Sequence, residues 1–261
     1  MPAYNTVAIV IRRLNYGETD KILTLYSRDR GRISAIAKGA RKAISRMSGS
    51  TELLTCTRFQ LATGKSLEIV TQTEIKESFT DLRQDIQRLA HGLYFADLID
   101  HVVADHDPNP VLYDLLLSGL YILQRVTPPE LAARWFDIQL LQDLGYAPDL
   151  ANCAVCREFL PGHFAHDEEF ALSASLGGAI CPRHAHPARN ADHSALDYEG
   201  LTLLQTLQRF GPDNGHLTAQ LPTPSARALN QTRLALRRYL RFRIERELKS
   251  LEFLDSLGYV A

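Results

Sequence analysis

The spacing of the hydrophobic residues changes near residue 80, and this change constrains the fold more than any other feature of the chain. Before it, short β-rich runs are broken by glycines, which predicts strands at 5–14, 21–27, 32–38, 52–61 and 67–75. After it, apolar residues recur at helical intervals. The chain is therefore expected to be an α+β protein in which a small β-barrel precedes a helical region.

The five predicted strands and their glycine-marked turns are typical of a small barrel over residues 1–79. A five-stranded OB-fold, which commonly binds oligonucleotides, fits this spacing, but an SH3-like barrel fits it almost as well. The pattern therefore predicts the class of domain and leaves its topology open.

The rest of the chain is predicted to be helical, with one interruption. Helical periodicity extends from about residue 80 to Asp107 and recurs near 110–125, 129–144 and 196–210. A last long helix is predicted from an N-cap at Ser225 to about residue 249. Residues 148–190 lose this periodicity and gather cysteines and histidines. We therefore expect a helical domain made of residues 80–147 and 191–261, with residues 148–190 inserted as a metal-organised module.

The inserted module carries two ligand pairs, Cys153-Ala-Val-Cys156 and Cys181-Pro-Arg-His184. Three thiolates and one imidazole at this spacing are typical of a closed, tetrahedral Zn²⁺ site. We expect one structural Zn²⁺ per chain, because four protein ligands leave no open position for catalysis. His186 is an alternative to His184, although the shorter Cys-x-x-His spacing favours His184. The fourth cysteine, Cys56, falls in a strand pattern and is expected to be buried.

Positive charge is concentrated at the two ends of the chain, although the net charge is only −1. Residues 1–50 hold ten lysines and arginines against three acids, and residues 226–249 hold eight against two. This asymmetry favours a nucleic-acid partner at the basic ends and a different partner for the acidic middle. The candidate DNA-binding residues are Arg12, Arg13, Lys21, Arg30, Arg32, Lys38, Arg41, Lys42, Arg46, Arg58, Lys65, Arg237, Arg238 and Arg241.

Aromatic side chains near the basic residues are candidates for stacking on bases, as in barrels that bind single strands. Tyr16 and Tyr26 are the better candidates, and Tyr4 and Phe59 are weaker ones, because core packing is the commoner fate of such residues. On the last predicted helix, the arginines at 237, 238 and 241 either extend the DNA-binding surface or only solvate one helix face, and the sequence does not choose between these roles.

Catalytic and membrane functions find little support in the sequence. A cluster of metal-capable side chains between Asp97 and Asp107 suggests a metal-dependent hydrolase, but its histidines are five residues apart, off the i,i+4 face that a helical metal site uses. Phosphate-binding and dinucleotide-binding motifs are absent, so no nucleotide cofactor is expected. The apolar runs are too short to span a membrane, no signal peptide is recognised, and the cysteine usage fits a cytoplasmic protein.

The N-terminal region resembles the RecO family of bacterial recombination mediators. The resemblance rests on Tyr16-Gly17-Glu18-Thr19-Asp20-Lys21, Leu25-Tyr26-Ser27, Gly31-Arg32-Ile33-Ser34-Ala35-Ile36-Ala37-Lys38-Gly39-Ala40-Arg41 and Ser45-Arg46, in this order and spacing. The Cys153/Cys156 pair and the terminal Leu248-Lys249-Ser250 segment are similar to family features too. His184 departs from the family pattern, since a fourth cysteine is usual at its position.

The resemblance implies an OB-fold, a central helical domain and a zinc module in a protein that is not an enzyme. It implies DNA repair and recombination through binding of single- and double-stranded DNA, strand annealing, and partnership with RecR and with the single-stranded-DNA-binding protein SSB. It further implies that RecA is helped onto SSB-coated DNA at the nucleoid. The alternatives that the residues themselves leave open are a metal-dependent hydrolase acting on nucleic acid and a zinc-finger transcriptional regulator.

Overall fold

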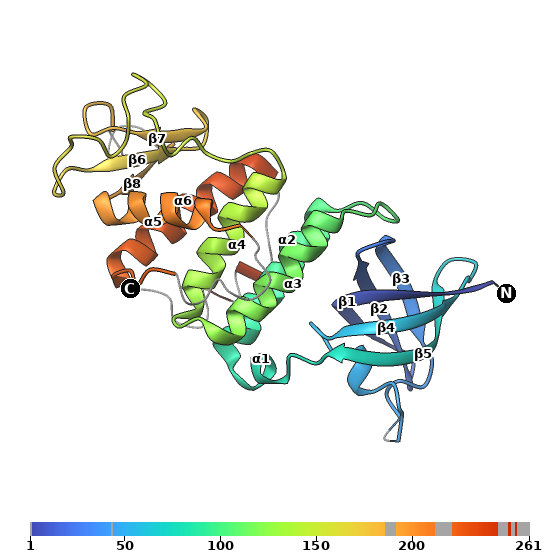
Figure 1. Cartoon of the computed structure of the whole chain (residues 1–261). Helices are drawn as coiled ribbons and strands as arrows, with labels where there is room; N and C mark the ends of the chain where they lie inside the picture. Colours follow the sequence, from blue (N-terminus) through green and yellow to red (C-terminus); the bar gives the residue numbers. More distant parts are fainter. Residues whose placement is uncertain are drawn as a thin grey trace. The chain divides into compact units, whose positions relative to one another are not determined.

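The computed structural model describes residues 2–42, 44–185, 192–211, 221–244, 250, 251 and 254 of the 261-residue chain. The chain forms two compact units, Met1–Gln124 with Leu248–Ala261, and Arg125–Glu247. Figure 1 labels the elements of both units. Among the described residues, no helix has the length and apolar composition that crossing a bilayer requires.

The first unit begins with five strands that close into a barrel in the order β1-β2-β3-β5-β4 (Figure 1). All neighbouring strands are antiparallel except β3 and β5, which pair in parallel. This topology is that of an OB-fold, so the structure decides between the two barrels that the spacing left open. The strands are β1 (Ala3–Tyr16), β2 (Asp20–Ser27), β3 (Gly31–Ala37), β4 (Cys56–Ala62) and β5 (Glu68–Glu77), with a short helix η1 (Gly49–Thr51) before β4.

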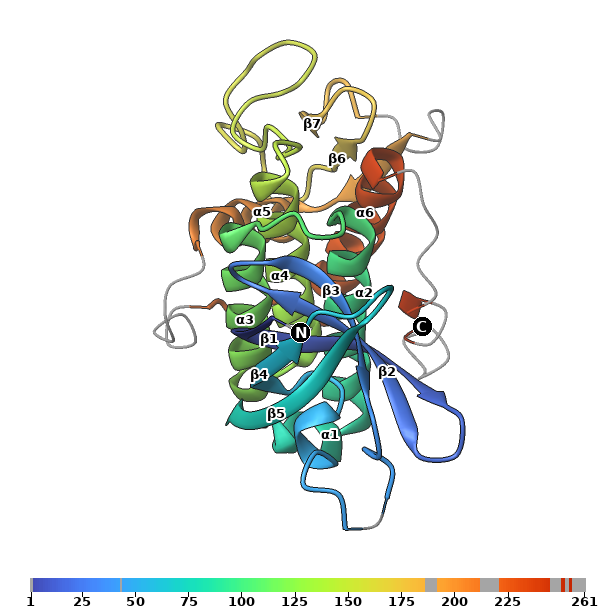
Figure 2. The same ribbon diagram turned by 90° about the vertical axis from the view of Figure 1, so that its right-hand side faces the viewer.

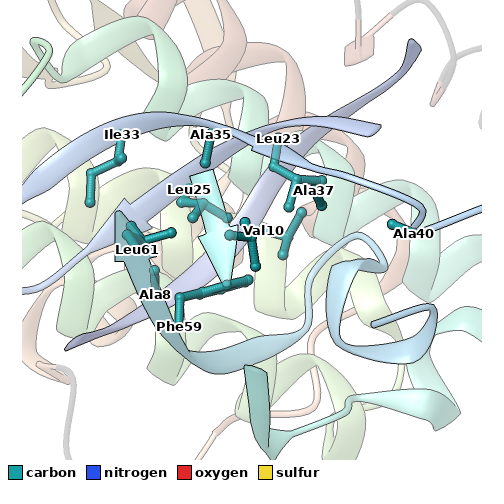
Figure 3. Packing of buried hydrophobic residues seen from close by; sticks show 11 residues of the cluster. Ala8, Val10, Leu23, Leu25, Ile33, Ala35, Ala37, Ala40, Phe59 and Leu61 are labelled. Atoms are coloured by element: carbon teal, nitrogen blue, oxygen red, sulfur yellow. The ribbon is translucent and has the colours of Figure 1, made fainter. Parts of the chain in front are cut away.

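The barrel is filled by the alternate residues of its strands, because successive side chains of a strand point to opposite faces. Leu23, Leu25, Ile33, Phe59 and Leu61 are fully buried inside it, as Figure 3 shows. The β1–β2 hairpin extends past the other strands (Figure 2), and residues 12–18 are all exposed there. The hairpin is therefore available to a partner of the barrel.

The barrel is followed along the chain by three helices, α1 (Thr80–Gln84), α2 (Ile86–Val102) and α3 (Pro110–Arg125). Asp85 caps α2, since its side chain accepts hydrogen bonds from the backbone N–H groups of Gln87 and Arg88. Cys56 is buried, as its strand position predicts. The change from strand to helix near residue 80 is confirmed.

The second unit combines helices with a small sheet. Ser225 caps α6 as predicted, because its hydroxyl accepts a hydrogen bond from the N–H of Ala228. The sheet has the order β7-β6-β8, and its strand β8 lies beyond residue 190, the predicted end of the inserted module. The domain boundaries drawn from the sequence remain a prediction. The elements are α4 (Pro129–Asp143), β6 (Phe170–Ser173), β7 (Gly178–Ile180), β8 (His193–Leu196), α5 (Tyr198–Arg209) and α6 (Ala226–Ile244).

Candidate nucleic-acid interface and metal centre

Two loops of the barrel are joined into one surface, the β1–β2 turn around Gly17 and the loop after β3. The backbone N–H of Arg41 donates to the carbonyl of Thr19 at 2.8 Å, and its guanidinium donates to the carbonyl of Gly17 at 2.9 Å. The N–H of Gly39 donates to the Asp20 carboxylate at 2.8 Å. These bonds hold the two loops together, and we call residues 14–20, 38–42 and 44–46 the joined-loop surface.

The carboxylate of Asp20 is the acceptor that ties the two loops. The hydrogen bond from the N–H of Gly39 lowers the pKa of Asp20, and the hydroxyl of Thr19 lowers it further. A carboxylate whose pKa is lowered stays ionised at neutral pH, so the bond to Gly39 persists there. Gly39 has a backbone φ of +68°, a conformation that residues with a Cβ atom rarely adopt.

The joined-loop surface presents exposed cations beside exposed apolar side chains. Lys38, Arg41, Lys42 and Arg46 are all exposed. Within the described part of the chain, the lysines and Arg46 form no ion pair with an acid. The exposed fractions of the neighbouring apolar side chains are 64% for Leu14, 55% for Tyr16 and 95% for Ile44.

The aromatic stacking candidates are separated by the structure. Tyr16 is exposed on the joined-loop surface, as a stacking role requires. Tyr26 is fully buried, so its choice as one of the better stacking candidates is wrong. Phe59 is also fully buried, which is the core packing expected as the commoner fate of these aromatics. Tyr26 lies under the segment that enters α3, where its hydroxyl donates to the carbonyl of Asn109 at 3.1 Å. Tyr4 is partly buried with the Arg30 guanidinium over its ring.

Two of the candidate arginines pair with acids at or just after the end of α2. Arg12 and Arg32 both donate to the carboxylate of Asp100 at 3.1 Å, and the side chain of Asp100 is only 7% exposed. Arg32 also donates to the carboxylate of Asp105 at 2.7 Å and to the carbonyl of Asp100 at 2.8 Å. These arginines attach the barrel to the end of α2 and the segment that follows it.

Lys21 is an internal ion-pair partner. It is 5% exposed, and its ammonium donates to the hydroxyl of Thr51 at 3.1 Å and to the carboxylate of Glu52 at 3.0 Å. Arg13 donates to the same carboxylate. Burial raises the pKa of Glu52, but the hydrogen bond from Lys21 and the charge of Arg13 outweigh burial, so the net shift is downward.

The remaining barrel candidates lie in exposed positions. Arg58 pairs with Glu74 at 3.2 Å, and Arg30 lies 3.8 Å from the carboxylate of Asp29. Lys65 is exposed in the β4–β5 loop and lines a polar pocket of about 230 Å³. These side chains are accessible to a ligand but lie outside the joined-loop surface.

The arginines of α6 lie in the second unit and serve at least partly to hold it together. Arg238 is exposed and donates to the carbonyl of His193 in β8 at 3.2 Å. Arg237 is partly buried, and Arg241 is exposed. Arg243 donates to the carbonyl of Ala174 at 3.0 Å. The contacts of Arg238 and Arg243 attach α6 to the small sheet, and they leave the DNA-binding role of the helix open.

Three carboxylates of the cluster between Asp97 and Asp107 bind neighbouring groups of the first unit. Asp97 accepts a hydrogen bond from the hydroxyl of Ser250 at 2.7 Å, while Asp100 and Asp105 accept from arginines of the barrel. Among the described residues, the only group of histidines, cysteines and acids close enough to share a metal ion lies elsewhere, in the second unit.

That metal-capable group consists of Cys153, Cys156, Cys181 and His184, the four residues predicted from the sequence. Their ligand atoms all lie within 4.8 Å of one another. The sulfur atoms of Cys156 and Cys181 are 3.8 Å apart, which matches the roughly 3.8 Å edge of a tetrahedron with Zn–S bonds of about 2.3 Å. His186 lies outside the described residues, so its competition with His184 is untested.

The backbone brings the two ligand pairs together. Each pair lies on a tight turn, in which the N–H of Arg157 donates to the carbonyl of Cys153 and the N–H of His184 to that of Cys181, both at 2.9 Å. The N–H of Ala154 donates to the carbonyl of Ala179 at 2.8 Å, which anchors the first turn beside β7. The folded loop therefore positions the ligands.

The thiols differ in their tendency to ionise. Burial raises the pKa of Cys153, but backbone N–H groups, chiefly that of Cys181, outweigh burial and lower it. Burial and the neighbouring thiols raise the pKa of Cys181. Because like charges at this distance resist joint ionisation, a cation is needed to hold Cys153 and Cys181 as thiolates together. The donor set and its geometry fit a metal ion.

Two features of the interface were not predicted from the sequence, the exposed apolar side chains of the joined-loop surface and the acids that bind Arg12, Lys21 and Arg32. Leu14 belongs to a strand pattern, where an apolar residue is normally expected to be buried. Asp100 lies 88 residues from Arg12 along the chain, and no local pattern connects them. Alternation from the core residues Ala8 and Val10 would place Leu14 inside the barrel, and the β-bulge between Val10 and Arg12 is what turns it outward.

Comparison with known proteins matches both parts of the chain to one family. The model described as "Recombination protein O N terminal" matches residues 1–79, and "Recombination protein O C terminal" matches residues 83–252. Proteins named "DNA repair protein RecO" are similar over 98–99% of this chain. They are 37% identical in Pelotomaculum thermopropionicum (96% of its length covered), 36% in Heliobacterium modesticaldum (91%) and 34% in Symbiobacterium thermophilum (98%).

Proposed function

The chain belongs to the RecO family of DNA repair proteins, and from this premise we propose that it is a mediator of homologous recombination that binds single- and double-stranded DNA. It promotes the annealing of complementary strands. With RecR, it helps to load RecA onto single-stranded DNA that is coated with SSB. It acts as a binding protein at the nucleoid in the cytoplasm and is not an enzyme.

The observation that carries this proposal is the joined-loop surface. Four exposed cations lie on two loops of an OB-fold that are tied together by the hydrogen bonds of Gly39 and Arg41. In OB-folds, the β1–β2 loop is among the elements that contact oligonucleotides. Cations without carboxylate partners are free to neutralise phosphates, which supplies most of the affinity for DNA irrespective of base order.

The structure refines the set of DNA-binding residues that we propose. Lys38, Arg41, Lys42 and Arg46 form its centre. Lys21 is left out because it is buried against Glu52. The flanking residues, which contribute less, are Arg12, Arg13, Arg30, Arg32, Arg58 and Lys65, and of these Arg32 is the least accessible because Asp100 and Asp105 bind it. The arginines at 237, 238 and 241 in the second unit are a separate candidate region.

Salt dependence tests this proposal directly. If the protein neutralises roughly 6–10 phosphates, its affinity for DNA falls about 10³- to 10⁵-fold between roughly 50 and 200 mM salt. Fluorescence anisotropy with a labelled single strand measures this slope, and affinity that does not respond to salt would contradict the proposal. Annealing of complementary strands coated with SSB, with and without the protein, then tests its role as a mediator.

We further propose that the Cys153, Cys156, Cys181 and His184 site holds one structural Zn²⁺. Its support is the donor set, since three sulfurs and one imidazole suit zinc and close a tetrahedral shell. Metal analysis of the purified protein tests occupancy. We expect one zinc ion per chain in the native protein and none in Cys156→Ser/His184→Ala, with Cys56→Ser as the matched cysteine control.

The hydrolase alternative is weakened by the contacts of its own candidate residues. Asp100 and Asp105 bind arginines of the barrel, and His101 contacts the carbonyl of Asp97 at 2.7 Å. Incubation of labelled oligonucleotides with divalent cations separates the two functions. If the protein cleaved the oligonucleotides and His106→Ala did not, the protein would be a nuclease and the mediator proposal would be wrong.

A further inference from the structure

The three cysteines of the metal-capable group differ in their exposure to solvent. Cys153 and Cys181 are fully buried, whereas Cys156 is exposed. The residues on either side of Cys156 are exposed as well, since Val155 is 50% exposed and the side chain of Arg157 is 75% exposed. Among these three cysteines, the sulfur of Cys156 is therefore the one that small molecules in solution can reach.

A second sulfur lies beside the exposed one. The sulfur atoms of Cys156 and Cys181 are 3.8 Å apart, and they would have to approach to about 2.05 Å to form a disulfide bond. Because Cys156 is at the surface, its side chain can move this distance without displacing packed atoms. An accessible cysteine with a second cysteine next to it is the arrangement that redox-sensing cysteines share.

The acid nearest to the exposed sulfur has its charge compensated. The carboxylate of Glu158 lies 4.0 Å from the sulfur of Cys156. The guanidinium of Arg183 pairs with this carboxylate at 3.4 Å, and the imidazole of His163 lies 3.6 Å from it. Negative charge next to a thiolate would disfavour its nucleophilic form, and these contacts reduce that effect.

The two turns that carry the ligands are also held by hydrogen bonds that involve no ligand atom. The side chain of Gln205 in α5 donates to the carbonyls of Leu150 and Leu160 at 2.8 and 2.9 Å, so it fixes both ends of the segment that contains the first ligand pair. The second pair directly follows β7, which is paired with β6. The ligands therefore stay near one another without the metal.

We propose that Cys156 is a site of oxidation by hydroperoxides, at which a disulfide with Cys181 forms and the metal is released, an assignment that rests on the proposed zinc site. The Cys156 thiolate attacks one peroxide oxygen, so that an S–O bond forms, the O–O bond breaks and hydroxide leaves. The Cys181 thiolate then attacks the sulfur of this sulfenic acid, so that the S–S bond forms and a second hydroxide leaves. The two thiolates supply the two electrons that reduce one peroxide.

The disulfide removes two of the four ligands. Cys153 and His184 alone do not close a tetrahedral shell, so the metal dissociates. Because metal binding is coupled to the folding of its loop, the two turns loosen, while the bonds of Gln205 and the β6–β7 pairing keep them in place. A thiol reductant cleaves the disulfide by exchange, and the ligands can bind the metal again. Oxidation at Cys156 is therefore reversible.

The test treats the native protein with hydrogen peroxide and follows zinc release with a chromogenic chelator. We expect the bound zinc to be released with the loss of two thiols per ion, and to be bound again after addition of dithiothreitol and zinc. Peptide mapping by mass spectrometry should find Cys156 linked to Cys181. Retention of zinc under peroxide, or a link between another pair of cysteines, would overturn the inference.

A variant isolates the exposed sulfur. Cys156→His keeps a zinc ligand at this position, and we expect it to release zinc about tenfold more slowly under peroxide, because no accessible thiolate remains. Cys56→Ser is the matched control, since Cys56 is a buried cysteine outside the group, and it should release zinc at the native rate. Release from Cys156→His at the native rate would contradict the assignment.

Two further results separate the inference from the proposal on which it rests. If Cys156→His does not retain zinc, the peptide mapping of the native protein decides, because it requires no variant. If the untreated, reduced native protein contains no zinc, the proposed zinc site itself is wrong and the inference fails with it. Zinc that is present before treatment and retained after it would overturn the inference alone.

Discussion

The first unit contains two groups of cations that look alike in the sequence and differ in the structure. Lys38 and Lys42 project from the joined-loop surface, whereas Lys21 and Arg32 are bound by carboxylates of the same unit. The first group is available to an external polyanion, and the second compensates internal acids. The comparison shows that a count of basic residues locates a charged domain but does not locate its binding surface.

The difference arises from the acids rather than from the bases. Asp100 and Glu52 are distant in sequence from the arginines and the lysine that they bind, and each accepts from two cations at once. A carboxylate with little exposure requires such partners, because an unpaired buried charge is costly. Asp20 of β2, the acid that contacts the loop after β3, accepts from the backbone N–H of Gly39 and forms no ion pair with a lysine among the described residues.

Reversal of the loop charges is expected to have the largest effect. Lys38→Glu/Lys42→Glu should weaken the binding of any DNA sequence roughly 100-fold at low salt and reduce the salt slope by about two, because two phosphate contacts are lost. Stability should change little, since neither lysine forms an ion pair within the described residues. Anisotropy titrations measure the affinity, with Lys76→Glu as the control. Equal losses in both variants would mean that only net charge matters.

Removal of an internal acid should instead affect stability. Asp100→Ala leaves Arg12 and Arg32 without their shared carboxylate and is expected to lower the free energy of unfolding by about 2 kcal/mol. DNA affinity should stay the same or rise. Urea unfolding measures the first effect, with Asp81→Ala on an exposed turn of α1 as the control. If Asp100→Ala lost DNA affinity but kept its stability, Arg12 and Arg32 would belong to the DNA-binding surface together with the loop lysines.

The ion pairs of Glu52 with Lys21 and Arg13, which we call the Glu52 cluster, should make stability depend on pH. The net pKa of Glu52 is lowered in the folded protein, so its ion pairs stabilise the fold above the pKa that it has when unfolded. This contribution is lost as the pH falls through the lowered folded pKa, below the ordinary range of a glutamate. Thermal unfolding between neutral and acid pH should show a smaller acid loss in Glu52→Gln than in the native protein. An identical pH profile would exclude the cluster as a source of stability.

The smallest effect is expected for an exposed ion pair. Arg58→Ala removes the contact with Glu74, in which both side chains are about half exposed, and should change the free energy of unfolding by less than about 0.5 kcal/mol. DNA affinity should fall less than about threefold. The same two assays check this variant. If Arg58→Ala lost as much DNA affinity as Lys38→Glu/Lys42→Glu, the DNA-binding surface would have to include β4 and β5.

Much of the fold was predictable because local patterns encode it. The change of hydrophobic period near residue 80 predicted the passage from barrel to helices, and both are present. The spacing of Cys153, Cys156, Cys181 and His184 predicted a group that the structure brings together. Strand order was not predictable, since register and closure depend on contacts between distant segments.

The sequence by itself determined the class of fold, the metal-capable group and the concentration of positive charge, because each depends on residues that are close together in the chain. Only the tertiary structure decided which cations are available to a ligand and which apolar side chains point outward. Those outcomes depend on Asp100, Glu52 and the register of Leu14 with Ile22, Ile36 and Ile69. The physical reason is that charge pairing and exposure are set by neighbours in space, which the fold selects from distant parts of the chain.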